Sequence, residues 1–160
     1  MRLLLRANAH RQTDDAILEV AASPDTPRRE RWQWQVRLLI DGQTASDTPP
    51  PAAHRIAAAL PGGMSVEVAA DPLTVAPTVE VLDPGSSPTV ARTEGELVVL
   101  IAAGGRVLAE DRHLLAHGDA LVLAGDEPLD VSVHRTDGSD ATIAVVRLAP
   151  VTDNALTWVP

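Results

Sequence analysis

The chain has 160 residues, with 13 Arg, no Lys and 22 acidic residues, and its formal net charge is −9. An acidic chain repels a phosphate backbone unless one face is strongly basic, so we expect no nucleic-acid partner. The absence of Cys excludes disulfides and thiolate metal sites, and the absence of Phe and Tyr leaves the core to aliphatic residues and three Trp.

The amino-terminal apolar run is short. It covers only residues 3–5, whereas a signal-peptide core needs roughly 7–15 apolar residues and a membrane span needs about 20. We therefore expect a cytoplasmic protein that does not associate with membranes.

Strand-like alternation dominates the first half of the chain. In residues 32–38 apolar and polar residues alternate with period two, which places Trp34 and Val36 on one face and Arg37 on the other. The proline-rich stretch 43–51 predicts an irregular loop.

Residues 51–60 have a helix-forming composition, but we favour a strand at this position. The Gly62-Gly63 pair and the alternating residues 64–68 that follow would complete a β-hairpin. A similar layout recurs 42 residues later, where Gly104-Gly105 separates two apolar stretches. This echo predicts a second hairpin.

The later segments predict two kinds of strand. Residues 73–82 and 129–133 alternate, whereas residues 97–102, 120–123 and 141–148 are continuous apolar runs suited to strands buried on both faces. Gly and Pro turn signals separate these segments. We therefore predict an all-β sandwich or barrel with no helix longer than about three turns.

Two stretches resemble known families. Residues 114–123, LLAHGDALVL, resemble the L-x-x-G-D-x-hydrophobic turn of cupins, and residues 16–24, AILEVAASP, are similar to the T-x-E-I-A-x-x-P stretch of the HutD/Ves family. The resemblance implies a cupin-like double-stranded β-helix in a single compact bicupin unit, 1–160. Its two small β-barrel halves would be residues 1–90 and 91–150, followed by a tail at 151–160.

The sequence also departs from that family. The family's W-K-N-G-G-G stretch is replaced by RQTDD at residues 11–15, and its G-P-F-S-x-F-P-G loop by the proline-rich residues 44–51. A loop lined by backbone amides is thereby lost. We therefore expect a shared fold more than a shared ligand.

Catalytic and metal signatures are weak. The chain has five His but no His-x-His pair, and His113 and His117 are four residues apart around a turn, where their rings need not converge. No Gly-x-Ser-x-Gly elbow occurs, and the paired acids at 14–15 and 126–127 suit solvated turns. We expect no metal and no cofactor.

The candidate binding residues are Glu19, Trp34, Arg37 and Arg55, which lie in the part of the chain that resembles the family. An inward-facing Arg would offer a planar donor fork to a carboxylate. The resemblance points to histidine utilisation, whose intermediates are acidic, and so implies a small anionic metabolite as the ligand.

Three functions remain open. The first is a non-catalytic binding or regulatory protein. The second is a metal-independent cupin enzyme, an isomerase or a lyase, that uses Glu19 or a His as general acid and base. The third is a protein-interaction module. We also expect a homodimer, because the predicted sheets have edge strands to cover.

Overall fold

Most of the described residues lie in β-strands. The computed structural model describes residues 1–14, 17–23, 33–40, 53–136, 138, 140–152, 156 and 158. Within these residues it contains fourteen strands and three short 3-10 segments, which confirms the predicted all-β fold. None of the described helical segments is long and apolar enough to cross a membrane. The predicted loop at 43–51 and Trp32 lie outside the described residues.

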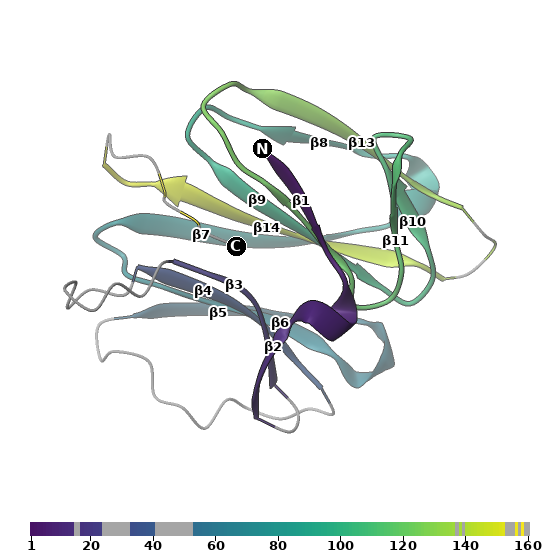
Figure 1. The fold of residues 1–160 in the computed structure, drawn as a ribbon, viewed down its shortest axis with the longest axis horizontal. Helices are drawn as coiled ribbons and strands as arrows, with labels where there is room; N and C mark the ends of the chain where they lie inside the picture. Colours follow the sequence, from purple (N-terminus) through teal and green to yellow (C-terminus); the bar gives the residue numbers. More distant parts are fainter. Residues whose placement is uncertain are drawn as a thin grey trace.

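The strands form three sheets (Figure 1). The central sheet has the order β1 (Arg2–Leu5), β12 (Ala120–Leu123), β9 (Leu97–Ala103), β14 (Thr142–Pro150) and β7 (Val75–Leu82). The N-terminal sheet has the order β2 (Arg11–Asp14), β3 (Ile17–Ala22), β4 (Trp34–Leu39), β6 (Ser65–Ala70) and β5 (His54–Ala59). The third sheet has the order β11 (His113–Leu115), β10 (Val107–Ala109), β13 (Leu129–Arg135) and β8 (Thr89–Arg92).

The central sheet lies between the other two and is apolar on both faces. Along β9, Val99 and Ile101 belong to the core shared with the N-terminal sheet, whereas Val98 and Leu100 belong to the core shared with the third sheet. The same alternation holds in β12 and β14. The prediction that these apolar runs are buried on both faces is confirmed. Strands from both predicted halves, such as β1 and β9, enter this sheet.

The outer sheets are amphipathic. Trp34, Val36 and Leu38 of β4 pack against the central sheet, and Val131 and Val133 of β13 do so from the other side. Their alternation with polar residues is the period-two pattern expected for a sheet with one buried face. The remaining face of each outer sheet is therefore available for polar groups.

The two Gly-Gly sequences have different roles. Gly62-Gly63 lies in the 3-10 segment η2 (Pro61–Gly63) and joins β5 to β6 in an antiparallel hairpin, as predicted. The second predicted hairpin is wrong, because β9 pairs with β12 and β14 whereas β10 pairs with β11 and β13. Gly104-Gly105 instead carries the chain from one layer to the next. Gly104 has φ +83°, and a Cβ there would lie 2.7 Å from the Asp140 carbonyl oxygen.

Asp119 ties the amino-terminal segment to the turn before β12. Its carboxylate accepts hydrogen bonds from Arg6 Nη1 at 2.7 Å and the Ala7 amide at 2.8 Å, and also from the Ala116 amide at 3.0 Å. The 3-10 segment η1 (Ala7–Ala9) is held beside that turn. The Gly-Asp turn that resembles cupins is therefore a structural anchor.

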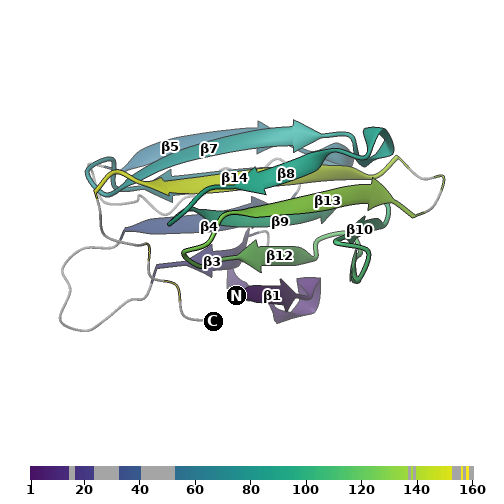
Figure 2. The same cartoon turned by 90° about the horizontal axis from the view of Figure 1, so that it is seen from above.

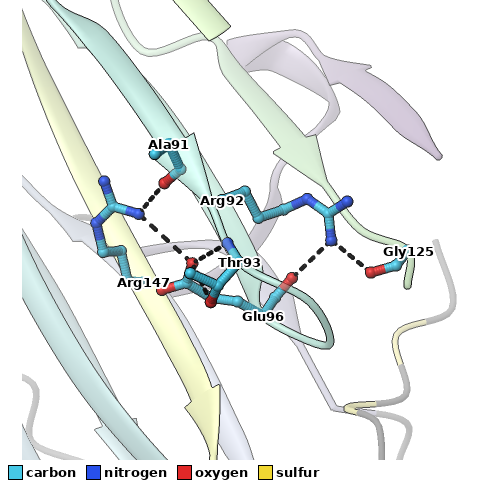
Figure 3. Close-up of polar contacts among 6 residues, drawn as sticks. All are labelled: Ala91, Arg92, Thr93, Glu96, Gly125 and Arg147. Carbon is cyan, nitrogen blue, oxygen red and sulfur yellow. Dashed lines mark hydrogen bonds and ion pairs between the residues drawn. The ribbon is translucent and has the colours of Figure 1, made fainter. Parts of the chain in front are cut away.

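A second polar cluster closes the opposite flank of the same layers (Figure 3). Arg147 of β14 donates to the Ala91 carbonyl of β8 and lies 3.5 Å from Glu96 Oε2. Arg92 donates to the carbonyls of Glu96 and Gly125. These arginines bond mainly to backbone oxygens, so the cluster joins the third sheet to the central sheet.

We predict that Asp119→Asn lowers the free energy of unfolding by about 2 kcal/mol at neutral pH, because an amide presents a donor where a carboxylate accepted charge-assisted hydrogen bonds. Burial raises the pKa of Asp119, but the Ala116 and Ala7 amides and the Arg6 guanidinium outweigh it and hold the pKa below the ordinary 3.8. The carboxylate therefore stabilises the fold above about pH 4, and its contribution falls as the pH drops through the lowered pKa.

Urea denaturation of both proteins at pH 7 and at pH 3 measures this effect. The difference between wild type and variant should shrink on acidification. An equal difference at the two pH values would show that Asp119 acts through packing and not through its charge.

Candidate functional site

The face of the N-terminal sheet that points away from the core carries a row of charged side chains. Glu19 of β3 is paired directly across the strands with Arg37 of β4, and Arg37 is paired with Glu67 of β6. Residues directly opposite in an antiparallel pair project from the same face. Because Trp34 and Val36 take the core face, Arg37 and its two carboxylate neighbours take the other.

Arg37 and Glu67 form a buried ion pair on this face. Their exposed fractions are 4% and 8%, and Arg37 Nη2 contacts Glu67 Oε1. Arg55 of β5 approaches the same carboxylate, with its Nη1 at 3.9 Å from Glu67 Oε2, and its side chain is 31% exposed. Two guanidinium groups thus form ion pairs with one carboxylate.

Glu19 is already engaged by neighbours. Gln35 Nε2 donates a hydrogen bond to Glu19 Oε2, and Arg11 Nη1 lies 3.9 Å from Glu19 Oε1. We name Arg11, Glu19, Gln35, Arg37, Arg55 and Glu67 the charged row. It gathers three of the chain's arginines on one face of the N-terminal sheet. Guanidinium groups have a geometry suited to the oxygens of a carboxylate or phosphate.

The structure brings three of the four predicted binding residues together. Glu19, Arg37 and Arg55 lie on the face of the charged row. Trp34 does not, because it alternates with Arg37 along β4 and is fully buried in the core. It fixes the sheet and cannot line a site on the opposite face.

Sequence reasoning missed Glu67. This residue is the acid that joins Arg37 to Arg55, and it stands in the alternating stretch Ser65-Val66-Glu67-Val68. A buried strand with one acid at an outward position was a detectable signal. Its partners, however, lie on other strands and could not be read from the segment itself.

The histidines do not converge. His117 Nδ1 accepts a hydrogen bond from the Gly104 amide at 3.0 Å, so its ring holds the layer-crossing turn. His113 Nε2 lies 3.6 Å from Glu110 Oε2, and His134 Nε2 lies 3.2 Å from Asp111 Oδ1. Among the described residues no group of three or more His, Cys, Asp or Glu is placed to hold a metal ion. The expected absence of a metal stays a prediction, which elemental analysis of the purified protein would test.

A shallow depression lies elsewhere in the molecule. It has a volume of about 340 Å³, and Asp83 and Arg135 line it together with Asp140 and Thr142. Arg135 Nη2 is 2.7 Å from Asp83 Oδ1. This pair bridges the loop after β7 and the end of β13, and none of the predicted binding residues reaches it.

Comparison with solved structures identifies the fold. PA5104 from Pseudomonas aeruginosa PAO1, a conserved protein of unknown function, has a TM-score of 0.68 at 15% identity over 94% of this chain and 100% of that chain. HutD from Pseudomonas fluorescens SBW25, in a formate condition, has a TM-score of 0.70 at 14% identity over 95% of this chain and 100% of that chain. No family model and no curated protein matches the sequence. The likeness confirms the HutD-like fold that the sequence resemblance predicted.

We predict that Arg37→Met destabilises the protein by about 3 kcal/mol, because it leaves the Glu67 carboxylate buried beside the more distant Arg55. The double variant Arg37→Met, Glu67→Leu should recover most of this loss, since it removes both charges. Urea denaturation of the two single variants and the double variant gives the coupling energy.

The matched control is Arg112→Met. Arg112 Nη2 is 3.2 Å from Glu110 Oε2, but the Arg112 side chain is 57% exposed, so its loss should cost less than about 1 kcal/mol. Equal losses in the free energy of unfolding for Arg37→Met and Arg112→Met would show that burial of the Arg37–Glu67 pair does not affect stability.

Proposed function

We propose that this cupin-like chain is a non-catalytic binding protein that holds a small carboxylate at the charged row, with Arg55 as the ionic anchor. The observation that carries the proposal is the sharing of the Glu67 carboxylate by Arg37 and Arg55. Arg55 is partly exposed there, so its guanidinium can also donate hydrogen bonds to a ligand carboxylate.

The roles of the two arginines differ. Arg37 is buried and held by Glu67, so it supplies a fixed positive charge without contacting solvent. Arg55 is partly exposed, and its distance of 3.9 Å from Glu67 exceeds that of a hydrogen bond. A carboxylate that reaches Arg55 would also lie near the Arg37–Glu67 ion pair, in which Glu67 offsets the charge of Arg37.

An acidic chain needs such a local cation to hold an anion. The net charge of −9 repels anions at long range, so affinity has to come from short-range, partly desolvated contacts. A charged hydrogen bond contributes roughly 1.5–3 kcal/mol. Small carboxylates meet this requirement, because their charge is concentrated on two oxygens. Such a ligand agrees with a regulatory role in the utilisation of an amino acid.

The arrangement favours binding over catalysis. Glu19, the residue considered as a general acid and base, accepts a hydrogen bond from Gln35 and lies near Arg11. Both neighbours thus occupy oxygens of the Glu19 carboxylate that a general acid and base would need to offer to a substrate. Product analysis after incubation with each carboxylate distinguishes the two functions, because a binding protein returns its ligand unchanged whereas an isomerase or lyase does not.

We predict that Arg55→Gln weakens carboxylate binding about tenfold or more, which corresponds to about 1.4 kcal/mol. The fold should remain intact, because Glu67 keeps Arg37 as its partner. Isothermal titration calorimetry with formate, acetate, succinate and glutarate measures the binding, and urea denaturation checks the fold.

Arg2→Gln is the matched control. Arg2 has a side-chain exposure of 33% and contacts Glu110, whose exposure is 13%, whereas the corresponding values for Arg55 and Glu67 are 31% and 11%. Its loss should leave the affinity unchanged. Binding that is equally weakened by Arg2→Gln would indicate general electrostatics, and no heat with any wild-type titration would refute the proposal.

A further inference from the structure

The depression of about 340 Å³ lies where the end of β7, the end of β13 and the start of β14 meet at one end of the molecule (Figure 2). Its volume falls at the lower end of the range for small-molecule sites, roughly 300–1,000 Å³. The charged row belongs to the N-terminal sheet, whereas strands of the central and third sheets form this depression. The two places are therefore independent of each other.

Arg135 supplies the positive charge among the described residues that line the depression. Its Nη2 donates a hydrogen bond to Asp83 Oδ1 at 2.7 Å, and its side chain is 26% exposed. A guanidinium has five N–H groups, and this bond is the only one that the Arg135 side chain makes within the described part of the chain. The group can therefore still donate to the oxygens of a ligand carboxylate.

The loop after β7 holds the Arg135 guanidinium in place. Asp83 Oδ1 also accepts a hydrogen bond from the Gly85 amide at 2.8 Å, and the Gly85 and Arg135 donors together hold the pKa of Asp83 below its ordinary 3.8. A Cβ on Gly85 would lie 2.5 Å from Arg135 Nη2. The guanidinium thus occupies a position that only glycine at residue 85 leaves open.

Asp140 places a negative charge on the wall formed by the start of β14. Its side chain is exposed and lines the depression. Among the described residues, none donates a hydrogen bond to the Asp140 carboxylate or forms an ion pair with it. The Asp140 carbonyl oxygen packs closely against Gly104, which fixes the backbone at this position. The carboxylate is therefore available to a ligand cation.

An apolar wall stands between these charged groups. Val81, Leu82 and Ala141 line the same depression. Val81 is 41% exposed, whereas most large apolar side chains of the described chain are buried. A ligand with an aliphatic group would remove part of the Val81 side chain from water.

We propose that this depression binds a free α-amino acid with an aliphatic side chain. The ligand carboxylate would accept hydrogen bonds from Arg135, its ammonium would pair with Asp140, and its side chain would pack on Val81. Two carboxylates and one guanidinium disfavour a simple anion here, because Asp83 already offsets the charge of Arg135. A zwitterion carries no net charge, so the field of an acidic protein does not repel it.

Three probes of similar shape test the need for both charges of the ligand. L-leucine carries both, isocaproate lacks the ammonium, and isoamylamine lacks the carboxylate. In isothermal titration calorimetry leucine should bind at least about tenfold more tightly than either of the other two, since each lacks one charged hydrogen bond. Equal affinity for leucine and one of the half-ligands, or no heat with leucine up to about 10 mM, would refute the proposal.

Asp140→Asn and Arg135→Gln should each weaken leucine binding about fivefold or more. Neither residue belongs to the charged row, so this loss would locate leucine in the depression. The control for Asp140 is Asp130→Asn, at another exposed acid. The control for Arg135 is Arg2→Gln, because Arg2 also lies 2.7 Å from an acid and is 33% exposed. Both controls should leave the affinity unchanged, and equal weakening by a control would overturn the assignment.

Gly85→Ala tests the placement of the guanidinium without removing a charge. Neither Gly85 nor Gly138 has a positive φ, so alanine fits the backbone at both positions. Gly85→Ala should weaken leucine binding about threefold or more, because the new Cβ displaces Arg135 Nη2. Gly138→Ala, where a Cβ would have no heavy atom within 4 Å, should have no effect. Urea denaturation checks that each variant is folded, and a Gly85→Ala protein that is folded and binds leucine as wild type does would contradict the role of Arg135.

Discussion

Burial of the central sheet on both faces is the constraint on which the rest of the structure depends. A strand such as β9, in which seven consecutive residues are apolar and buried, cannot lie at a surface. It needs an apolar layer on each side, and the N-terminal and third sheets supply these layers. The burial of aliphatic area accounts for most of the stabilisation available to a chain that contains no Phe and no Tyr.

The three-layer arrangement determines where charge can be placed. Each outer sheet turns one face to the core, and its polar residues must take the other face. On the N-terminal sheet, neighbouring strands then align Glu19, Arg37 and Glu67 across three strands. A single buried Arg would be costly to desolvate, and the Glu67 carboxylate in contact with Arg37 offsets part of that cost.

Polar clusters elsewhere have a different role, because they close the flanks between layers. Asp119 holds the amino-terminal segment to the turn before β12, and Arg147 with Arg92 joins β14 to β8 and its neighbouring loops. These groups satisfy backbone atoms that would otherwise remain unpaired at sheet edges. The charged row lies instead on the outward face of the N-terminal sheet, where its arginines contact the carboxylates of Glu19 and Glu67.

Sequence alone determined the all-β class, the burial of the continuous apolar runs and the opposite orientation of Trp34 and Arg37, since all of these depend on period-two alternation within one segment. Strand neighbours, by contrast, are set by contacts between distant segments. The pairing of Arg37 with Glu67 across 30 residues is such a contact. The layer crossing at Gly104 also depends on distant segments, because the Gly-Gly turn signal does not show which sheet the next strand joins. Tertiary packing therefore decided which predicted residues share a face, because register and layer order are properties of the assembled sheets.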